Sequence, residues 1–569
     1  MIDRRSLLGG AAGAAAMTAV PAWARGRDVK AHHDHALRPG FDEVRGPMID
    51  LTVSQGRFDA GGWSGHAVAI NGSVPGPLIR LREGQNARLR VRNLLDEDTS
   101  IHWHGLLLPF QYDGVPGLSF PGIRPGETFE YAFPVRQSGS YWWHSHSGMQ
   151  EQMGLYGPLI IDPAGPDPVS TDRDYVLLLS EFTPLHPHAM MAKLKKDPGY
   201  FNFQQTSWTD EYGLSGRERR MWANMRMMST DIADVTGSVY TYLANGRSAD
   251  DAAEFLFLRG ERVRLRVING SAMTFFNLRI PGLAMTVVAA DGQNVRPVEV
   301  DELQIGVAET YDVLIEPGAA EAYAIVAESM DRSGMAAAML AQAPGLRAPL
   351  PALRPPPVLG MADMGMNHGS SHGGHEAMGM AGMSMRDTSL LPPDVAVGPG
   401  IDMVSMAPVE KWDDPGLGLR DVPHRTLNYA KLAARDANPD PRTPSRLLEI
   451  HLTGNMERYM WSFDGRKYAA VSDHPIRFAH NERVRVRLIN NTMMAHPIHL
   501  HGHFFELVNG AEAGSQPRKH TLIVQPGASA VFDLTANEPG DWAFHCHLLF
   551  HMHAGMMQTV SVSFPEQGA

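Results

Sequence analysis

Residues 254–271 read EFLFLRGERVRLRVINGS, an apolar run followed by a Gly-Glu turn and then by Val and Leu alternating with Arg. Alternation with a period of two places the apolar side chains on one face and the Arg side chains on the other, which is typical of a half-buried strand. The pattern recurs in residues 67–95 (AVAINGSVPGPLIRLREGQNARLRVRNLL) and 474–492 (HPIRFAHNERVRVRLINNT). Three copies of one pattern predict three homologous domains built from β-strands.

The positions of the copies set the expected domain limits. We expect an all-β fold of three consecutive Greek-key domains, at residues 46–165, 172–345 and 420–569, with a linker over 346–419. Residues 186–229 have the weakest strand pattern, and we expect a short helix or an extended loop there.

Composition narrows the classes of partner. A length of 569 residues predicts two to four domains, and 43% hydrophobic with 20% charged residues is typical of a folded protein. A formal charge of -12 and a pI near 6.1 argue against nucleic acid or an anionic membrane as the main partner. The single cysteine excludes a disulfide within the chain.

Residues 1–24, MIDRRSLLGGAAGAAAMTAVPAWA, predict a twin-arginine export signal. Arg4 and Arg5 precede an Ala/Gly-rich stretch, and the segment ends in a small-x-small cleavage site, Ala-Trp-Ala. The apolar part is too short and too poor in Leu and Ile to span a membrane, and no other transmembrane segment is expected. We therefore expect a bacterial protein that the Tat export machinery delivers to the periplasm.

Histidines dominate the chemistry of the two terminal domains. Four His-x-His pairs occur, at His102 and His104, His144 and His146, His499 and His501, and His545 and His547. Residues two apart on a strand point to the same face, so each pair can direct two imidazoles to one place. Eight imidazoles suit a polynuclear site of copper, zinc or iron.

Cys546 lies between His545 and His547, and strand parity turns its side chain to the opposite face. This predicts a second metal site, joined to the first through one residue on each side. Two His, one Cys and a distant Met are the ligand set of a blue-copper site, and His551 and Met556 follow Cys546 on an expected loop. Zinc is the rival metal, although this set fits structural zinc poorly. One such copper and three clustered coppers can store the four electrons that reduction of O₂ to water requires.

The motifs HWHG (102–105), WHSH (143–146), HPIHLHGH (496–503) and HCHLLFHMHAGM (545–556) resemble those of multicopper oxidases in order and spacing. The resemblance covers essentially the whole mature chain and implies three cupredoxin domains that hold four copper ions. It places His496, Cys546, His551 and Met556 on one type 1 copper, His102 and His499 on one type 2 copper, and His104, His144, His146, His501, His545 and His547 on two type 3 coppers.

Within the family, the chain resembles the bacterial copper-resistance (protein A type) subgroup. The residues that carry this are TDIADVTGSVYTYLANG (230–246), the twin-arginine leader and a Met-rich insert, MADMGMNHGSSHGGHEAMGMAGMSM (361–385). The resemblance implies periplasmic copper tolerance through oxidation of Cu(I), and of phenols in some members, with O₂ as acceptor. The alternatives are a laccase with phenolic donors and a copper-sequestering protein.

The insert is expected to be mobile, because it has too few bulky apolar residues to fold by itself. Thioethers select Cu(I), which favours an arm that captures labile Cu(I) and delivers it to the type 1 site over a linker of biased composition. Its candidate ligands are Met361, Met364, Met366, His368, His372, His375, Met378, Met380, Met383 and Met385.

One acidic residue matches a proton donor of the family. Asp113, in FQYDGVPG, occupies the position of the acid that other members place near the type 2 copper, and its alternative is a turn aspartate. After His551 this chain has Met552 and His553, where some relatives carry a carboxylate thought to relay protons. A second proton relay is therefore left open.

Overall fold

The computed structural model describes residues 35–202, 204, 214–225, 228–360, 363, 385–468 and 474–565. The chain divides into two units, Met1–Ala36 and Leu37–Ala569. The predicted export signal and all predicted Cu(I) ligands of the insert except Met385 lie outside the described residues.

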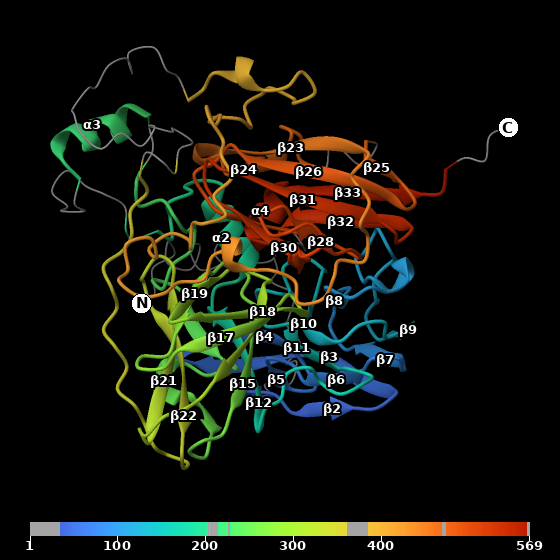
Figure 1. Cartoon of the computed structure of the whole chain (residues 1–569), viewed down its shortest axis with the longest axis vertical. Helices are drawn as coiled ribbons and strands as arrows, with labels where there is room; N and C mark the ends of the chain where they lie inside the picture. The colour runs from blue at the N-terminus through green and yellow to red at the C-terminus, as the bar shows by residue number, and fades with distance from the viewer. Residues whose placement is uncertain are drawn as a thin grey trace, which may run out of the picture. The chain divides into compact units, whose positions relative to one another are not determined.

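Within the unit Leu37–Ala569, the described residues form six β-sheets that come in consecutive pairs along the chain, and Figure 1 shows their strands. The first pair consists of the sheets β1-β5-β4-β3-β7-β9 and β2-β6-β11-β10-β8. Its strands are β1 (Arg38–Pro39), β2 (Glu43–Arg45), β3 (Met48–Ala60), β4 (Trp63–Ile70), β5 (Ser73–Val74), β6 (Leu78–Arg82), β7 (Asn86–Asn93), β8 (His102–His104), β9 (Thr128–Pro134), β10 (Gly139–His144) and β11 (Tyr156–Asp162).

The second pair consists of the sheets β13-β12-β15-β20-β17-β18 and β14-β22-β21-β16-β19. Its strands are β12 (Arg173–Phe182), β13 (Thr241–Ala244), β14 (Ala253–Leu256), β15 (Val263–Asn269), β16 (Phe276–Arg279), β17 (Met285–Ala290), β18 (Gln293–Val300), β19 (Glu302–Ile305), β20 (Thr310–Ile315), β21 (Ala322–Ser329) and β22 (Met335–Ala341).

The third pair consists of the sheets β24-β23-β26-β31-β28-β29 and β25-β33-β32-β27-β30. Its strands are β23 (Arg446–Asn455), β24 (Met460–Phe463), β25 (Ile476–Ala479), β26 (Glu482–Asn490), β27 (His496–Leu500), β28 (Phe505–Leu507), β29 (Arg518–Lys519), β30 (Thr521–Val524), β31 (Ser529–Ala536), β32 (Gly540–Cys546) and β33 (Met557–Ser563).

The second and third pairs have the same topology, because adding eleven to each strand number of the second pair gives the strand order of the third. The repeated alternating strand forms β7, β15 and β26, and in each pair it runs parallel to the first long strand, β3, β12 or β23. The predicted all-β repeat is therefore confirmed, while the predicted domain limits stay predictions.

The half-buried pattern predicted for these strands is correct for β7 but wrong for β15. β7 alternates exposed and buried residues, whereas every residue of β15 is buried. Arg264 and Arg266 of β15 form ion pairs with Asp312, and Arg266 also donates to Ser140 Oγ of β10 at 2.9 Å. The polar face of β15 thus packs against the first pair and is not exposed to solvent.

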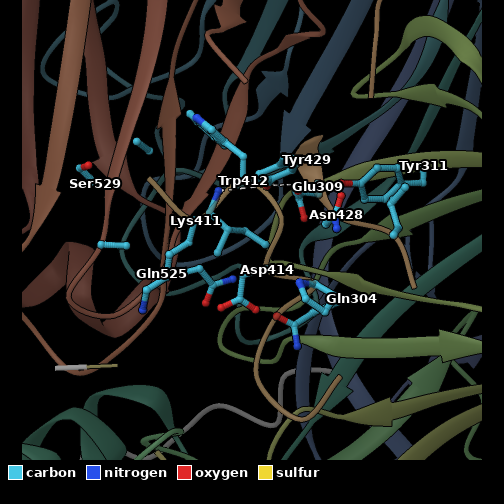
Figure 2. Close-up of a pocket in the computed structure, with 15 residues that line it drawn as sticks. Gln304, Glu309, Tyr311, Lys411, Trp412, Asp414, Asn428, Tyr429, Gln525 and Ser529 are labelled. Atoms are coloured by element: carbon cyan, nitrogen blue, oxygen red, sulfur yellow. Dashed lines mark hydrogen bonds between the residues drawn. The ribbon is translucent and has the colours of Figure 1, made fainter. Parts of the chain in front are cut away.

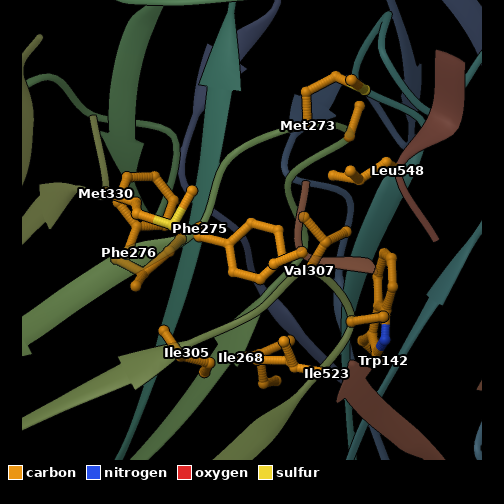
Figure 3. Packing of buried hydrophobic residues seen from close by; sticks show 14 of the residues in the cluster. Trp142, Ile268, Met273, Phe275, Phe276, Ile305, Val307, Met330, Ile523 and Leu548 are labelled. Carbon is orange, nitrogen blue, oxygen red and sulfur yellow. The ribbon is translucent and has the colours of Figure 1, made fainter. Parts of the chain in front are cut away.

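One hydrophobic cluster extends through all three pairs (Figure 3). It includes Trp142 of β10, Ile268 of β15, Ile523 of β30 and Leu548, each at most 7% exposed. Burial of such side chains contributes about 1.5–3 kcal/mol each, so the packing between pairs is part of the hydrophobic core.

The described helices are short. Residues 186–229, expected to hold a helix or a loop, contain α2 (Pro187–Leu194) and α3 (Gly216–Met225). His551, expected on a loop, lies on α4 (Leu549–Ala554). The 3₁₀ turns among the described residues are η1 (Phe110–Tyr112), η2 (Ala249–Asp251), η4 (Thr388–Leu390), η5 (Tyr429–Lys431) and η6 (Met456–Arg458). Among the helices of the described residues, none has both the length and the apolar character that crossing a membrane requires.

Candidate metal centre

Five groups of three side chains could hold a metal ion in the described part of the chain, with ligand atoms within 4.8 Å of one another. They are His102–His499–His501, His104–His144–His547, His104–His499–His520, His146–His501–His545 and His496–Cys546–His551. Four groups contain only histidines and share members, so they form one cluster. The fifth contains the cysteine.

Strand pairing places the histidines. β8 and β10 are antiparallel neighbours with His102 opposite His144, and β27 and β32 are antiparallel neighbours with His499 opposite His545. The first and third sheet pairs meet at these strands, because the His102 ring stacks on His501 and the His104 ring on His499, each at 3.8 Å between centroids. The histidine cluster is therefore shared by the two terminal sheet pairs.

Backbone carbonyl oxygens fix the protonated nitrogen of several imidazoles. His102 Nδ1 lies 2.7 Å from the Asp113 carbonyl oxygen, and His499 Nδ1 lies 2.7 Å from that of His520. A carbonyl oxygen can only accept, so Nδ1 carries the proton and Nε2 keeps its lone pair. These Nε2 atoms are buried without a hydrogen-bond partner, as are those of His104, His144, His146 and His547.

Such a set of unpaired nitrogens is unfavourable unless it binds a ligand. Burial, reinforced by the neighbouring histidines, lowers the pKa well below its ordinary value for His104, His144, His146, His499, His501 and His547. Neutral imidazole is the form that binds metals. The side chains present therefore fit a cluster of copper ions.

The cysteine site lies on the other face of β32. Cys546 Sγ is 3.5 Å from His496 Nδ1 and 3.9 Å from His551 Nδ1, and the two Nδ1 atoms are 3.3 Å apart. All three residues are fully buried, and burial raises the pKa of the thiol. Met556 is buried as well, and its backbone is hydrogen-bonded to those of Cys546 and His551.

The far nitrogens of both histidines have partners. His496 Nε2 lies 2.7 Å from Thr492 Oγ1, and His551 Nε2 lies 2.9 Å from Asp234 Oδ2. The same Asp234 oxygen accepts the Tyr459 hydroxyl at 2.7 Å. Asp234 precedes β13, so a residue between β12 and β13 of the second sheet pair orients a histidine of the third.

Asp113 lies between the two terminal sheet pairs. Its Oδ2 is 2.9 Å from His501 Nδ1 and its Oδ1 is 3.3 Å from His102 Nδ1, with only 1% of the carboxylate exposed. Asp113 directly follows the 3₁₀ turn η1, so it is also a turn residue, as the alternative interpretation expected. Its position at the turn is compatible with its contacts to the two histidines.

Three residues of the site were missed by the sequence analysis. Asp234 lies within the segment 230–246, but no histidine or cysteine lies near it in the sequence at a spacing typical of metal ligands. His520 follows no motif, yet it forms a group with His104 and His499. Glu151 follows the WHSH motif, and its Oε2 lies 2.7 Å from His144 Nδ1.

Other histidines and methionines have different surroundings. His503 is buried, its Nδ1 lies 3.1 Å from the His501 carbonyl oxygen, and its Nε2 accepts from the Glu538 amide at 3.4 Å. Met552 is half-buried on α4, and His553 is exposed there. The Met385 side chain is buried in the hydrophobic cluster, and its role as a Cu(I) ligand stays a prediction.

A separate pocket lies between the second and third sheet pairs (Figure 2). Its lining includes Gln304, Glu309 and Tyr311 together with Trp412 and Tyr429. None of its lining residues belongs to the five candidate groups, so this pocket is not the metal centre.

Comparison with known proteins agrees with this geometry. Three family models, each described as multicopper oxidase, match residues 52–165, 174–345 and 441–565. Copper resistance protein A of Escherichia coli is 45% identical, over 92% of this chain and 94% of that protein. A copper resistance protein A homolog of Pseudomonas syringae pv. tomato is 46% identical, over 92% and 93%.

Solved structures share the fold. The multicopper oxidase Fet3p, described as functioning in iron import, gives a TM-score of 0.66 at 19% identity over 91% of this chain and 90% of its own. The laccase from Botrytis aclada gives 0.64 at 21% identity over 92% and 88%. These neighbours confirm the predicted fold class of three consecutive cupredoxin-like Greek-key domains.

Proposed function

Because this chain belongs to the multicopper oxidase family, we propose that it couples one-electron oxidation of Cu(I) to four-electron reduction of O₂ to water. The observation that carries the proposal concerns the tripeptide His545–Cys546–His547, whose three residues lie in three different candidate metal-binding groups. Cys546 lies with His496 and His551, while His545 and His547 each lie in a separate histidine group. Electrons accepted at one site thus have a covalent route of a few bonds to the other.

We assign the ligands by these groups. His496, Cys546, His551 and Met556 would hold type 1 copper, and His102 and His499 would hold type 2 copper. The type 3 pair would be held by two complete groups, His104–His144–His547 and His146–His501–His545. Bound copper would supply one-electron redox chemistry at the first site and O₂ reduction at the cluster.

The protein's own groups connect the two sites. Besides the covalent bonds, the Cys546 carbonyl oxygen accepts a hydrogen bond from His545 Nδ1 at 2.9 Å. This contact adds a second connection between the cysteine residue and a cluster histidine. It also fixes the His545 tautomer, leaving Nε2 to face the other histidines.

Asp113 is proposed as the proton donor at the cluster. Support comes from its burial and from its two histidine contacts, His102 and His501, one from each terminal sheet pair. A group in this position can deliver a proton next to the site of O₂ reduction without exposing that site to solvent.

The electron donor is proposed to be Cu(I), supplied by the Met/His arm in the periplasm after Tat export. Support comes from relatives named copper resistance protein A, from the leader sequence and from the soft thioether ligands of the insert. A laccase with phenolic donors and a copper-sequestering protein are the competing functions.

Oxygen uptake by the copper-loaded protein, measured with Cu(I) and separately with a phenol, distinguishes these functions. Faster uptake with Cu(I), together with four coppers per chain, is the expected result. Uptake with the phenol alone would support the laccase, and copper binding without uptake from either donor would support sequestration.

A further inference from the structure

A buried carboxylate outside the sequence motifs lies next to two of the candidate ligands. Glu151 lies in the connection between β10 and β11, and 2% of its side chain is exposed. Its Oε2 is 2.7 Å from His144 Nδ1, and its Oε1 is 3.9 Å from His547 Nδ1. Both histidines belong to the group His104–His144–His547, so one carboxylate faces two ligands from different sheet pairs.

Glu151 Oε2 and His144 Nδ1 form a short contact of the ion-pair type, and the neighbouring backbone shows which nitrogen of His144 carries the proton. The Ser145 carbonyl oxygen lies 3.1 Å from the same Nδ1 and can only accept. Nδ1 of His144 therefore carries the proton and donates to the Ser145 carbonyl oxygen, with the Glu151 carboxylate 2.7 Å away, and the lone pair is on Nε2. That Nε2 is buried and has no hydrogen-bond partner, so it is available to a metal.

The neighbours of Glu151 hold it in place from both sides. The Gln150 side chain accepts from Thr99 Oγ1 at 2.7 Å and also donates to the Asp98 carbonyl oxygen at 2.9 Å. The Gln152 side chain accepts from the Tyr240 hydroxyl at 2.6 Å. Anchors on both sides fix the reach of the carboxylate toward His144.

We propose that Glu151 is the positioning residue of the group His104–His144–His547. Its Oε2 supports the Nδ1-protonated tautomer set by the Ser145 carbonyl oxygen and holds the ring orientation of His144, and its Oε1 faces His547 from the opposite sheet pair. A hydrogen-bond acceptor behind a metal-binding imidazole makes that imidazole a better ligand, and loss of such an acceptor typically costs 10–100-fold in metal affinity or activity. This inference rests on the proposed copper function and concerns one copper of the cluster.

The test separates the effect of the side-chain length at position 151 from the effect of its negative charge. Glu151→Gln keeps the reach of an acceptor oxygen but removes the charge, whereas Glu151→Asp keeps the charge but is one methylene shorter. Copper-loaded proteins are dialysed against a chelator series, and copper per chain and EPR-visible copper are counted. We expect Glu151→Asp and Glu151→Leu to release cluster copper about 10–100-fold more readily, while the blue absorption of the Cys546 site persists and Glu151→Gln stays close to wild type.

Glu181 provides the matched control. It is buried, and its charge adds to the larger effect of burial in raising the pKa of Glu151. Its Oε1 accepts from the amides of Ala272 and Met273 and from no histidine. Glu181→Gln and Glu181→Asp should therefore keep all cluster copper. Thermal unfolding of each copper-free variant shows whether it is folded.

Several outcomes would overturn the inference. One is full copper retention in folded Glu151→Asp or Glu151→Leu. Another is a loss of cluster copper in Glu151→Gln as large as that in Glu151→Leu, which would mean that the negative charge, and not the position of the oxygen atom, retains the copper. Equal losses in the Glu181 variants would point to general destabilisation. Because copper retention is measured directly, the result remains readable even if the wild-type protein consumes no O₂ and the proposed function fails.

Discussion

Asp234 connects the second sheet pair to the proposed type 1 site through a single carboxylate oxygen. That oxygen accepts from His551 Nε2 at 2.9 Å and from the Tyr459 hydroxyl at 2.7 Å, and all three side chains are at most 3% exposed. Asp234→Ala leaves two buried donors without an acceptor. An unsatisfied buried group costs about 1–3 kcal/mol, so the two together should cost about 2–6 kcal/mol.

The assay is native-state hydrogen exchange of the copper-free protein, followed in the peptide that contains α4. The amides of Gly555 and Met556 donate to the His551 carbonyl oxygen and report on local opening. A loss of 2 kcal/mol or more should raise their exchange rate by a factor of about 30 or more. Because Asp234→Ala and Tyr459→Phe remove the same interaction, the double variant should lose about 1–3 kcal/mol less than the sum of the single variants.

Asp331 gives the control for this prediction. It is also a buried aspartate of the second sheet pair, and it accepts from the Ser333 amide at 3.4 Å rather than from a histidine. Asp331→Ala should leave exchange at α4 unchanged. Wild-type protection in Asp234→Ala, or strict additivity with Tyr459→Phe, would refute the assignment of Asp234 as the partner that orients His551.

The other predictions concern the thiol, the insert and pH. Cys546→Ser should abolish the blue absorption while the histidine cluster still binds copper; a protein that stays blue would refute the ligand assignment. Deletion of residues 361–385 should slow oxygen uptake with Cu(I) more than with phenols, and equal slowing would refute the delivery arm. Burial and the nearby Asp234 raise the pKa of Asp231 to about 7. The folded state then holds this proton more tightly than the unfolded state, so stability should fall as pH rises from about 4 to 7, by at most about 4 kcal/mol. Urea titrations should show a flatter profile for Asp231→Asn, and a wild-type profile in that variant would contradict the prediction.

Local sequence patterns were sufficient for the strands and for the motif histidines. Period-two alternation predicts β7 and its repeats, because strand geometry alone sets which face a side chain occupies. The same rule separates Cys546 from His545 and His547, which lie in different groups. These predictions need no knowledge of how the domains pack.

Predictions that depend on packing between sheet pairs were incomplete. The burial of Arg266 follows from contact with β10, and the local pattern of β15 contains no sign of that contact. His520 joins His104 and His499 only because β30 and β8 are brought together, and no spacing rule links them. Asp234 and Glu151 escaped notice for the same reason.

The acids around the metal centre show how the three sheet pairs depend on one another. Asp113 and Glu151 come from the first pair, Asp234 comes from the second, and each of them faces a histidine on the third. A ligand that binds only the correctly oriented histidines stabilises the packing that orients them, by about 2.7 kcal/mol per site at a hundred times its dissociation constant. Copper binding and the association of the sheet pairs are therefore thermodynamically linked, and a substitution at an interface acid acts on both. Through this linkage the second sheet pair, whose described residues contribute no candidate ligand, is still coupled to the metal centre.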